Sequence, residues 1–199
     1  MLSSKDEILQ KIWPLLNFDA YGVAGLETLG LTRASVLIII HYRHTIPYII
    51  LTKRSGSIRL HSSEICFPGG RYDPVEDRNL LDTAIRETTE ELGLALTERD
   101  IIGSLRPVRT LTSNFIIHPF VTIQGMIARP KSVSKEVERI IDAPLYKVLK
   151  SIAPDHRHSE ITQNRDLYKF KYKDDIIWGA TSQILKQLHD HLYEKAYDN

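Results

Sequence analysis

The stretch RETTEELGL, residues 86–94, places three glutamates within five positions of one another. Asn79 upstream is a suitable helix N-cap and Gly93 is a natural helix stop, so the sequence predicts a helix between them. At about 100° per residue, the apolar side chains of this helix group on one side. The adjoining flank carries, within an arc of roughly 100°, Glu87, Glu90 and Glu91. Their carboxylates can therefore converge on one point, with Arg86 lying beside them.

The repulsion between these carboxylates has two explanations. An exposed cluster costs only about 0.2 to 0.5 kcal/mol per pair, which a surface helix tolerates. In a partly enclosed site, at about 6 Å and an effective dielectric constant near 20, the repulsion rises to roughly 3 kcal/mol. Such a site needs a divalent cation, and oxygen ligands suit Mg²⁺ or Mn²⁺. The turn at residues 68–70, Pro-Gly-Gly, favours the second explanation, because glycine has no Cβ to keep a metal or phosphate away from the backbone.

Composition limits the kind of protein that could carry this site. The chain has 199 residues with 42% hydrophobic content, enough for one well-buried core, so we expect a single domain over residues 1–199. With 26 basic and 25 acidic residues, it lacks the chain-wide positive charge of a nucleic-acid binder. The longest aliphatic run, residues 36–40, is too short to span a membrane, and the single cysteine, Cys66, excludes an internal disulfide. We expect a cytoplasmic protein without a nucleic-acid or membrane partner.

The remaining sequence pattern is that of an α/β protein. Residues 4–13 predict a short amphipathic helix with an apolar stripe formed by Ile8, Leu9, Ile12 and Trp13. Residues 34–42 and 46–52 are rich in β-branched side chains and predict two strands that form a hairpin. A short strand is expected in EICF, residues 64–67, and an amphipathic helix near the end of the chain has its apolar stripe within residues 184–192.

Gly70, the loop after it and residues 86–94 together resemble the Nudix box, G-x5-E-x7-R-E-U-x-E-E-x-G-U, where U is aliphatic. The spacing from the glycine to the arginine is two residues longer than in the standard box. The loop carboxylate of the motif therefore falls on Glu76 or on Asp77. Thr88 stands where the motif has an aliphatic residue, and its methyl group can still pack. The resemblance implies a Nudix-type α/β/α sandwich with a mixed β-sheet.

A second stretch, IILTKRSGSIRLHSSEICFPGG at residues 49–70, resembles the signature of the Nudix coenzyme A pyrophosphatases. Its matches in register are Leu51, Thr52, Arg54, Ser55, Arg59 and the run from Phe67 to Gly70. Ile50 stands in place of a leucine, and Ser63 in place of a glycine with more backbone freedom. Later segments, including residues 114–121 and 135–145, also look like this subfamily, so the likeness covers about residues 33–190.

The resemblance implies a role for each group of site residues. A diphosphate repels nucleophiles, so metal ions must neutralise its charge and activate a water. The implied metal ligands for Mg²⁺ or Mn²⁺ are Glu87, Glu90, Glu91 and the Gly70 carbonyl. Arg86 would orient these carboxylates. The general base is a box glutamate or Glu136, and the implied substrate-binding residues are Arg54, Arg59, Phe67, Gly69 and Gly70.

Three functional hypotheses follow. The favoured one is hydrolysis of coenzyme A or a derivative to 3′,5′-ADP and 4′-phosphopantetheine or its derivative. The second is a Nudix hydrolase of ADP-ribose or a dinucleotide, which Ser63 and the longer loop support. The third is a non-catalytic nucleotide sensor, which has no need of all three glutamates. The partner is a small molecule in each case, and a homodimer is a possible assembly. His156 and His158 are interpreted as loop residues and Trp178 as a packing residue.

Overall fold

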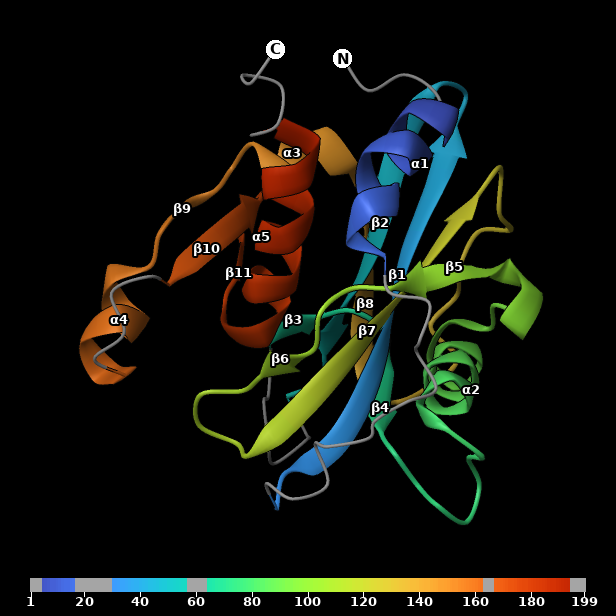
Figure 1. The fold of residues 1–199 in the computed structure, drawn as a ribbon, viewed down its shortest axis with the longest axis horizontal. Coiled ribbons are helices and arrows are strands. Elements are labelled where there is room, and N and C mark those ends of the chain that lie inside the picture. Colours follow the sequence, from blue (N-terminus) through green and yellow to red (C-terminus); the bar gives the residue numbers. More distant parts are fainter. Residues whose placement is uncertain (1–4, 17–29, 57–63, 163–166, 194–199) are drawn as a thin grey trace.

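The computed structural model describes residues 5–16, 30–56, 64–162 and 167–193 (Figure 1). In chain order its helices are α1 (Lys5–Ile12), the 3-10 helix η1 (Trp13–Leu15), α2 (Leu80–Leu92), the 3-10 helix η3 (Glu98–Asp100), α3 (Leu145–Leu149), α4 (His156–Thr162) and α5 (Gly179–Tyr193). Its strands are β1 (Thr32–Arg43), β2 (Ile46–Arg54), β3 (Ile65–Cys66), β4 (Gly69–Arg71), β5 (Ile101–Ser104), β6 (Val108–Arg109), β7 (Phe115–Gln124), β8 (Val137–Pro144), β9 (Ala153–Pro154), β10 (Tyr168–Tyr172) and β11 (Asp175–Ile177).

The main sheet is built around β1, whose middle, residues 36–40, is a continuous apolar run rich in β-branched side chains. β1 forms the predicted antiparallel hairpin with β2, with Ile40 opposite Ile49. On its other side β1 runs parallel to β7 from the Thr32–Phe115 pair onward. β4 pairs antiparallel with β1, β8 with β2, and β5 and β6 with β7. The sheet is therefore mixed, as expected.

The two faces of this sheet are both covered by helices, because successive side chains of a buried strand point to opposite sides. Ile38 and Ile40 of β1 belong to the larger core, which α1 and α5 complete. Leu37 and Ile39 belong to a second core under α2. Figure 1 shows α2 on one side of the sheet and α5 on the other. This arrangement confirms the α/β/α sandwich.

The N-terminal helix is confirmed, but one member of its predicted stripe is wrong. Ile8 and Ile12 are fully buried, whereas Trp13 is 51% exposed. The α-helix ends at Ile12, and the chain continues as the 3-10 helix η1, with Pro14 in its first turn. A 3-10 helix advances by a larger angle per residue, so Trp13 leaves the apolar face. The stripe of α5 is confirmed, since its buried side chains include Ile184, Leu185, Leu188 and Leu192.

A small antiparallel sheet of β9, β10 and β11 lies beside α5. Here the histidine interpretation is wrong, because His156 and His158 lie in the short helix α4 and not in a loop. The ring of His158 stacks on Trp178 with 4.0 Å between centroids, and its Nδ1 lies 2.6 Å from the buried Asp155. Both contacts are structural, and the packing role of Trp178 is confirmed.

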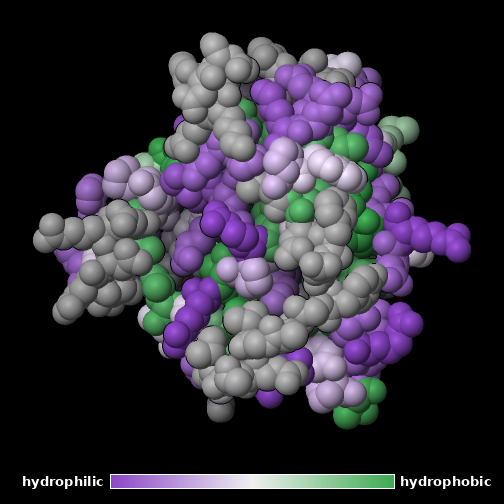
Figure 2. Space-filling model, viewed as in Figure 1, coloured by the Kyte–Doolittle hydropathy of each residue, from purple (hydrophilic) through white to green (hydrophobic). Residues whose placement is uncertain are grey.

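The surface of the described residues is mixed in character. Figure 2 shows hydrophilic residues separating the apolar ones into several areas on the face viewed there. No helix in the described parts of the chain is both long and apolar enough to span a bilayer.

Candidate active site

The site begins at the Pro68-Gly69-Gly70 turn, which β4 holds against the centre of the sheet. Gly69 has φ +147°, and a Cβ there would lie 2.2 Å from the backbone oxygen of Ser35. Only glycine fits at this position. Its N–H donates to Oε2 of Glu91 at 3.3 Å. The turn therefore reaches α2 through its backbone.

Gly70 makes an equally close approach to α2. A Cβ on Gly70 would lie 2.4 Å from the carboxyl carbon of Glu87. The missing side chain leaves the space in which the Glu87 carboxylate sits. The absence of a side chain at Gly70 therefore allows the Glu87 carboxylate to lie directly against the turn.

The helix α2 starts and ends where its sequence predicts. The Asn79 side chain accepts hydrogen bonds from the N–H groups of Leu81 at 2.9 Å and Asp82 at 3.0 Å. Gly93 ends the helix in the left-handed region, with φ +65°. The fixed N-cap determines which residues face the sheet and which face the turn.

The three glutamates occupy different environments. Glu91 is only 5% exposed, and burial raises its pKa to about 7 although the Gly69 N–H opposes this change. Burial also raises the pKa of Glu87, against the attraction of Arg86. The Glu90 side chain is 55% exposed. The acidic face therefore passes from a buried carboxyl to a solvated one within a single turn of helix.

Arg86 is held by the buried carboxylate of Asp77. Its Nε and Nη2 donate to the two Asp77 oxygens at 2.8 and 3.0 Å. The Thr83 hydroxyl donates to Asp77 as well, at 2.8 Å. Burial alone would raise the pKa of Asp77, but the hydrogen bonds from Arg86 and Thr83 outweigh it and the pKa is lowered. Glu76 is more exposed and lies 3.6 Å from Arg86, so Asp77 is the loop carboxylate that fixes this arginine.

The same arginine also contacts the acidic face of α2. Its Nη2 lies 3.1 Å from Glu87, and its Nη1 lies 3.3 Å from Glu90. Arg86 therefore links the loop to two of the predicted metal ligands. The sequence left open which loop carboxylate anchors this link, because the two-residue insertion hides the register of the motif.

Two other predicted residues come from the opposite side of the site. Arg54, at the end of β2, lies 3.6 Å from Glu136 through its Nη2. The Ser55 N–H donates to the Glu136 carbonyl at 2.7 Å, which fixes the two segments together. The charges of Arg54 and Glu136 both act on the pKa of Glu91. Arg54 and Glu136, which are remote in sequence, thus pair with each other close enough to Glu91 for their charges to act on it.

Some predicted residues lie elsewhere. Arg59 and Ser63 fall outside the described residues. Phe67 is 1% exposed and packs in the larger core, so its side chain positions the turn from behind. Sequence reasoning missed the contact between the Gly69 N–H and Glu91. The only signal for it in the sequence was the pair of adjacent glycines, Gly69 and Gly70.

The donor chemistry of this site fits a hard divalent cation. Its carboxylate oxygens are ligands that such a cation prefers, and within the described ranges the buried acid Glu91 has no ion pair with a cationic side chain. In the described part of the chain, no three Asp, Glu, His or Cys side chains are already grouped around one point. Glu87 and Glu90 instead contact Arg86. Arg86 therefore holds both carboxylates on the side of α2 that faces the loop.

The sandwich, the glycine turn and the glutamate-bearing helix together define the Nudix class of α/β proteins. The NUDIX domain family matches residues 31–145, and the chain belongs to this family. Its members are in general pyrophosphohydrolases that use divalent metal ions, and the activity that the family supports is hydrolysis of a nucleoside diphosphate derivative.

Similar proteins agree with this assignment. The chain is 32% identical to an uncharacterized Nudix hydrolase NudL of Yersinia pestis, over 78% of this chain and 77% of that protein. It is 31% identical to NudL of Photorhabdus laumondii, over 71% of this chain and 75% of that protein.

Solved structures share the fold at low sequence identity. A MutT/nudix family protein from Enterococcus faecalis has a TM-score of 0.59 at 13% identity, covering 98% of this chain and 76% of its own. The NUDIX domain of Shewanella oneidensis NrtR, solved with ADP ribose, has a TM-score of 0.54 at 13% identity, covering 92% of this chain and 97% of its own.

Proposed function

We propose that this protein hydrolyses the diphosphate bond of coenzyme A or a derivative, giving 3′,5′-ADP and 4′-phosphopantetheine or its derivative. The observation that carries the proposal is the contact of the stretch at residues 49–70 with α2, where the Gly69 N–H donates to Glu91 at 3.3 Å. Arg54 belongs to the stretch that resembles the coenzyme A signature, and its charge acts on Glu91 of the Nudix box. This proximity supports a single site that combines the substrate stretch with the glutamates of α2.

The roles of the residues follow from their positions. Glu91, Glu87, Glu90 and the Gly70 carbonyl would hold Mg²⁺ or Mn²⁺, which would neutralise the diphosphate oxygens and activate a water. A buried carboxyl such as Glu91 is the costliest to leave ionised, so a cation beside it relieves the largest penalty.

Arg54 and Arg86 serve different purposes in this scheme. The Nε of Arg54 is buried without a hydrogen-bond acceptor among the described residues, so a phosphate oxygen can take that place. Arg86, clamped by Asp77, limits the directions in which the carboxylates of Glu87 and Glu90 can point. Arg59 is proposed to grip a second phosphate oxygen.

The proton of the attacking water goes to a carboxylate oxygen. Glu136 is the candidate from outside α2, because its side chain is 61% exposed and lies beside Arg54. A glutamate of α2 is the other candidate. Glu136→Gln separates the two, since it lowers turnover by orders of magnitude only if Glu136 accepts this proton.

A substrate panel tests the proposal. Purified protein is incubated with Mg²⁺ or Mn²⁺ and with coenzyme A, ADP-ribose or a dinucleoside polyphosphate, and the products are identified by mass spectrometry. We expect coenzyme A to be cleaved with the highest kcat/KM. Faster cleavage of ADP-ribose or of the dinucleotide would replace the coenzyme A proposal with the second hypothesis, and binding without cleavage would indicate a sensor.

Two variants connect the panel to the site. Glu91→Gln should lower turnover by orders of magnitude on every cleaved substrate. Arg54→Ala should raise KM for coenzyme A. Unchanged turnover in the first variant would remove the metal-binding role of Glu91.

A further inference from the structure

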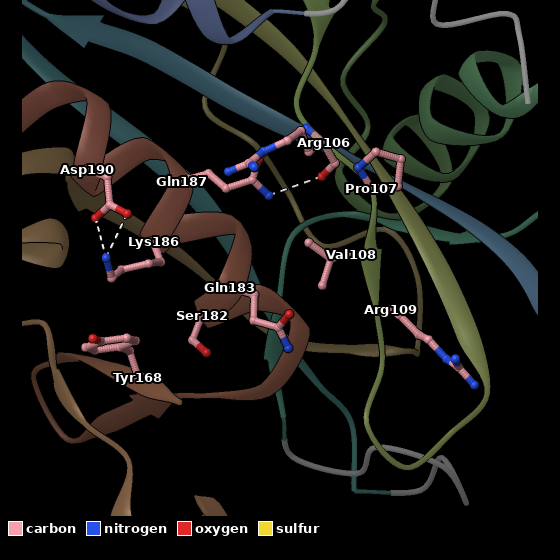
Figure 3. A pocket seen from close by; sticks show the side chains of 10 residues that line it. All are labelled: Arg106, Pro107, Val108, Arg109, Tyr168, Ser182, Gln183, Lys186, Gln187 and Asp190. Carbon is pink, nitrogen blue, oxygen red and sulfur yellow. Dashed lines mark hydrogen bonds and ion pairs between the residues drawn. The ribbon is translucent and has the colours of Figure 1, made fainter. Parts of the chain in front are cut away.

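A groove of about 470 Å³ lies on the side of the sheet opposite α2. It opens between α5 and the segment at residues 106–109, which contains the short strand β6 (Figure 3). Val108 at its base belongs to the core shared with α5. A volume of this size accommodates a nucleotide-sized molecule. The residues assigned above to hydrolysis do not line it.

The rim of the groove is fixed by a side-chain amide. The Arg106 backbone N–H donates to Oε1 of Gln187 at 3.1 Å, and Nε2 of Gln187 donates to the Arg106 carbonyl at 3.1 Å. One side chain of α5 therefore binds both backbone groups of Arg106, as Figure 3 shows in part. This clamp fixes the backbone of Arg106, one of the two arginines, with Arg109, that this segment contributes to the lining.

The opposite wall is also fixed. Lys186 lies 2.6 Å from Asp190 one helical turn on, and its Nζ sits 4.9 Å from the centre of the Tyr168 ring. The ammonium group is thus held at one position over the aromatic face. In Figure 3, Ser182 and Gln183 lie on α5 one turn before Lys186 and Gln187.

The charges of the two walls do not cancel. Asp190 is matched by Lys186, whereas the guanidinium of Arg106 has no acidic partner within the described ranges. A guanidinium binds phosphate oxygens in pairs, and the Gln183 amide and the Tyr168 hydroxyl add hydrogen-bonding capacity. The lining therefore combines a phosphate-binding end with polar groups and the apolar Val108 for the body of a ligand.

We propose that this groove binds a small phosphomonoester, with its phosphate on Arg106 and its body towards Ser182 and Gln183. Cleavage of a diphosphate by water leaves a phosphomonoester on each product, so the groove suits the class of molecule that the proposed reaction releases. This link to the products rests on the proposed function, whereas the binding itself does not. The protein would then sense product at a face separate from α2.

The test measures binding without catalysis. The full-length ¹⁵N-labelled protein is titrated with adenosine 5′-monophosphate in the presence of EDTA, and amide signals of residues 106–109 and 182–187 are followed by NMR. We expect saturable changes in these signals for the wild type. Arg106→Ala and Lys186→Gln should each weaken the binding about tenfold or more. Adenosine, which lacks the phosphate, should bind much more weakly.

Two control variants locate the effect. Arg99→Ala removes an exposed arginine of η3 and should leave the affinity unchanged. Arg54→Ala changes the proposed hydrolytic site and should likewise have no effect on the groove signals. The proposal is overturned if the groove signals do not move, if adenosine binds as tightly as its phosphate, or if Arg54→Ala abolishes the changes and Arg106→Ala does not. None of these readouts depends on whether coenzyme A is hydrolysed.

Discussion

The buried carboxyl of Glu91 makes a quantitative prediction about stability without metal. Its pKa rises from an ordinary value of 4.5 to about 7 on folding. Each pKa unit corresponds to about 1.4 kcal/mol, so ionising Glu91 costs the metal-free fold about 3 kcal/mol. The folded state binds this proton more tightly than the unfolded state. The cost is therefore absent below pH 4.5, grows between pH 4.5 and 7, and is complete above that range.

Glu91→Gln removes this ionisation while keeping an oxygen for the Gly69 N–H. In EDTA at about pH 8.5, the variant should be more stable than the wild type by about 3 kcal/mol, and near pH 4.5 the difference should become small. Urea unfolding at several pH values measures this difference. Glu160→Gln, a change at an exposed glutamate of α4, is the matched control and should show no such trend.

Added Mg²⁺ or Mn²⁺ should reverse the order at high pH. A cation that binds only the folded protein stabilises it in proportion to its affinity, and the wild type keeps the carboxylate that the variant lacks. If wild type and Glu91→Gln show parallel stability curves from acid to alkaline pH, the buried-carboxyl reasoning is wrong. If only the metal effect is missing, the assigned ligand is wrong.

Three further predictions concern neighbouring residues. The Thr88 hydroxyl is buried with no hydrogen-bond partner among the described residues, so Thr88→Val should raise the free energy of unfolding by about 1 kcal/mol in urea unfolding. Thr83→Val is the control, because it loses a hydrogen bond to Asp77 and should lower the free energy of unfolding in the same assay. Gly70→Ala should weaken Mn²⁺ binding in calorimetry by about tenfold or more with little loss of thermal stability, because the new Cβ displaces only the flexible end of Glu87. Asp77→Asn should cost about 3 kcal/mol in urea unfolding and lower turnover, since Arg86 loses a buried charge partner, and an unchanged midpoint would contradict this role.

Local signals explain why α2 could be predicted so closely. A cap at Asn79 and a left-handed glycine at Gly93 act within a few residues of the helix, so the sequence shows them directly. The burial of individual glutamates could not be predicted in this way. Glu90 and Glu91 share one arc of the helical wheel, yet the Gly69 turn covers Glu91 alone, and that contact depends on the pairing of β4 with β1.

Other features depended on partners distant in the chain. Residues 34–42 predicted a strand, but no local pattern indicated that this strand would run parallel to β7. The side chain of Trp13 fitted the helical stripe, and only the change to a 3-10 helix before Pro14 places it outside. The sequence left open whether Glu76 or Asp77 binds Arg86, because the spacing of residues gives no measure of their burial.

The parallel pairing of β1 with β7 has a consequence for synthesis of the protein on the ribosome. β1 is synthesised early but can form this pairing only after β7 has been synthesised. Contacts between segments this far apart in the sequence slow folding. Glu136 is synthesised later still, immediately before β8. Its ion pair with Arg54 and the pairing of β8 with β2 complete the contacts around Arg54. A nascent chain that stops short of β8 therefore holds the glutamates of α2 without the groups that face them, and hydrolytic competence would come only after most of the polypeptide has been translated.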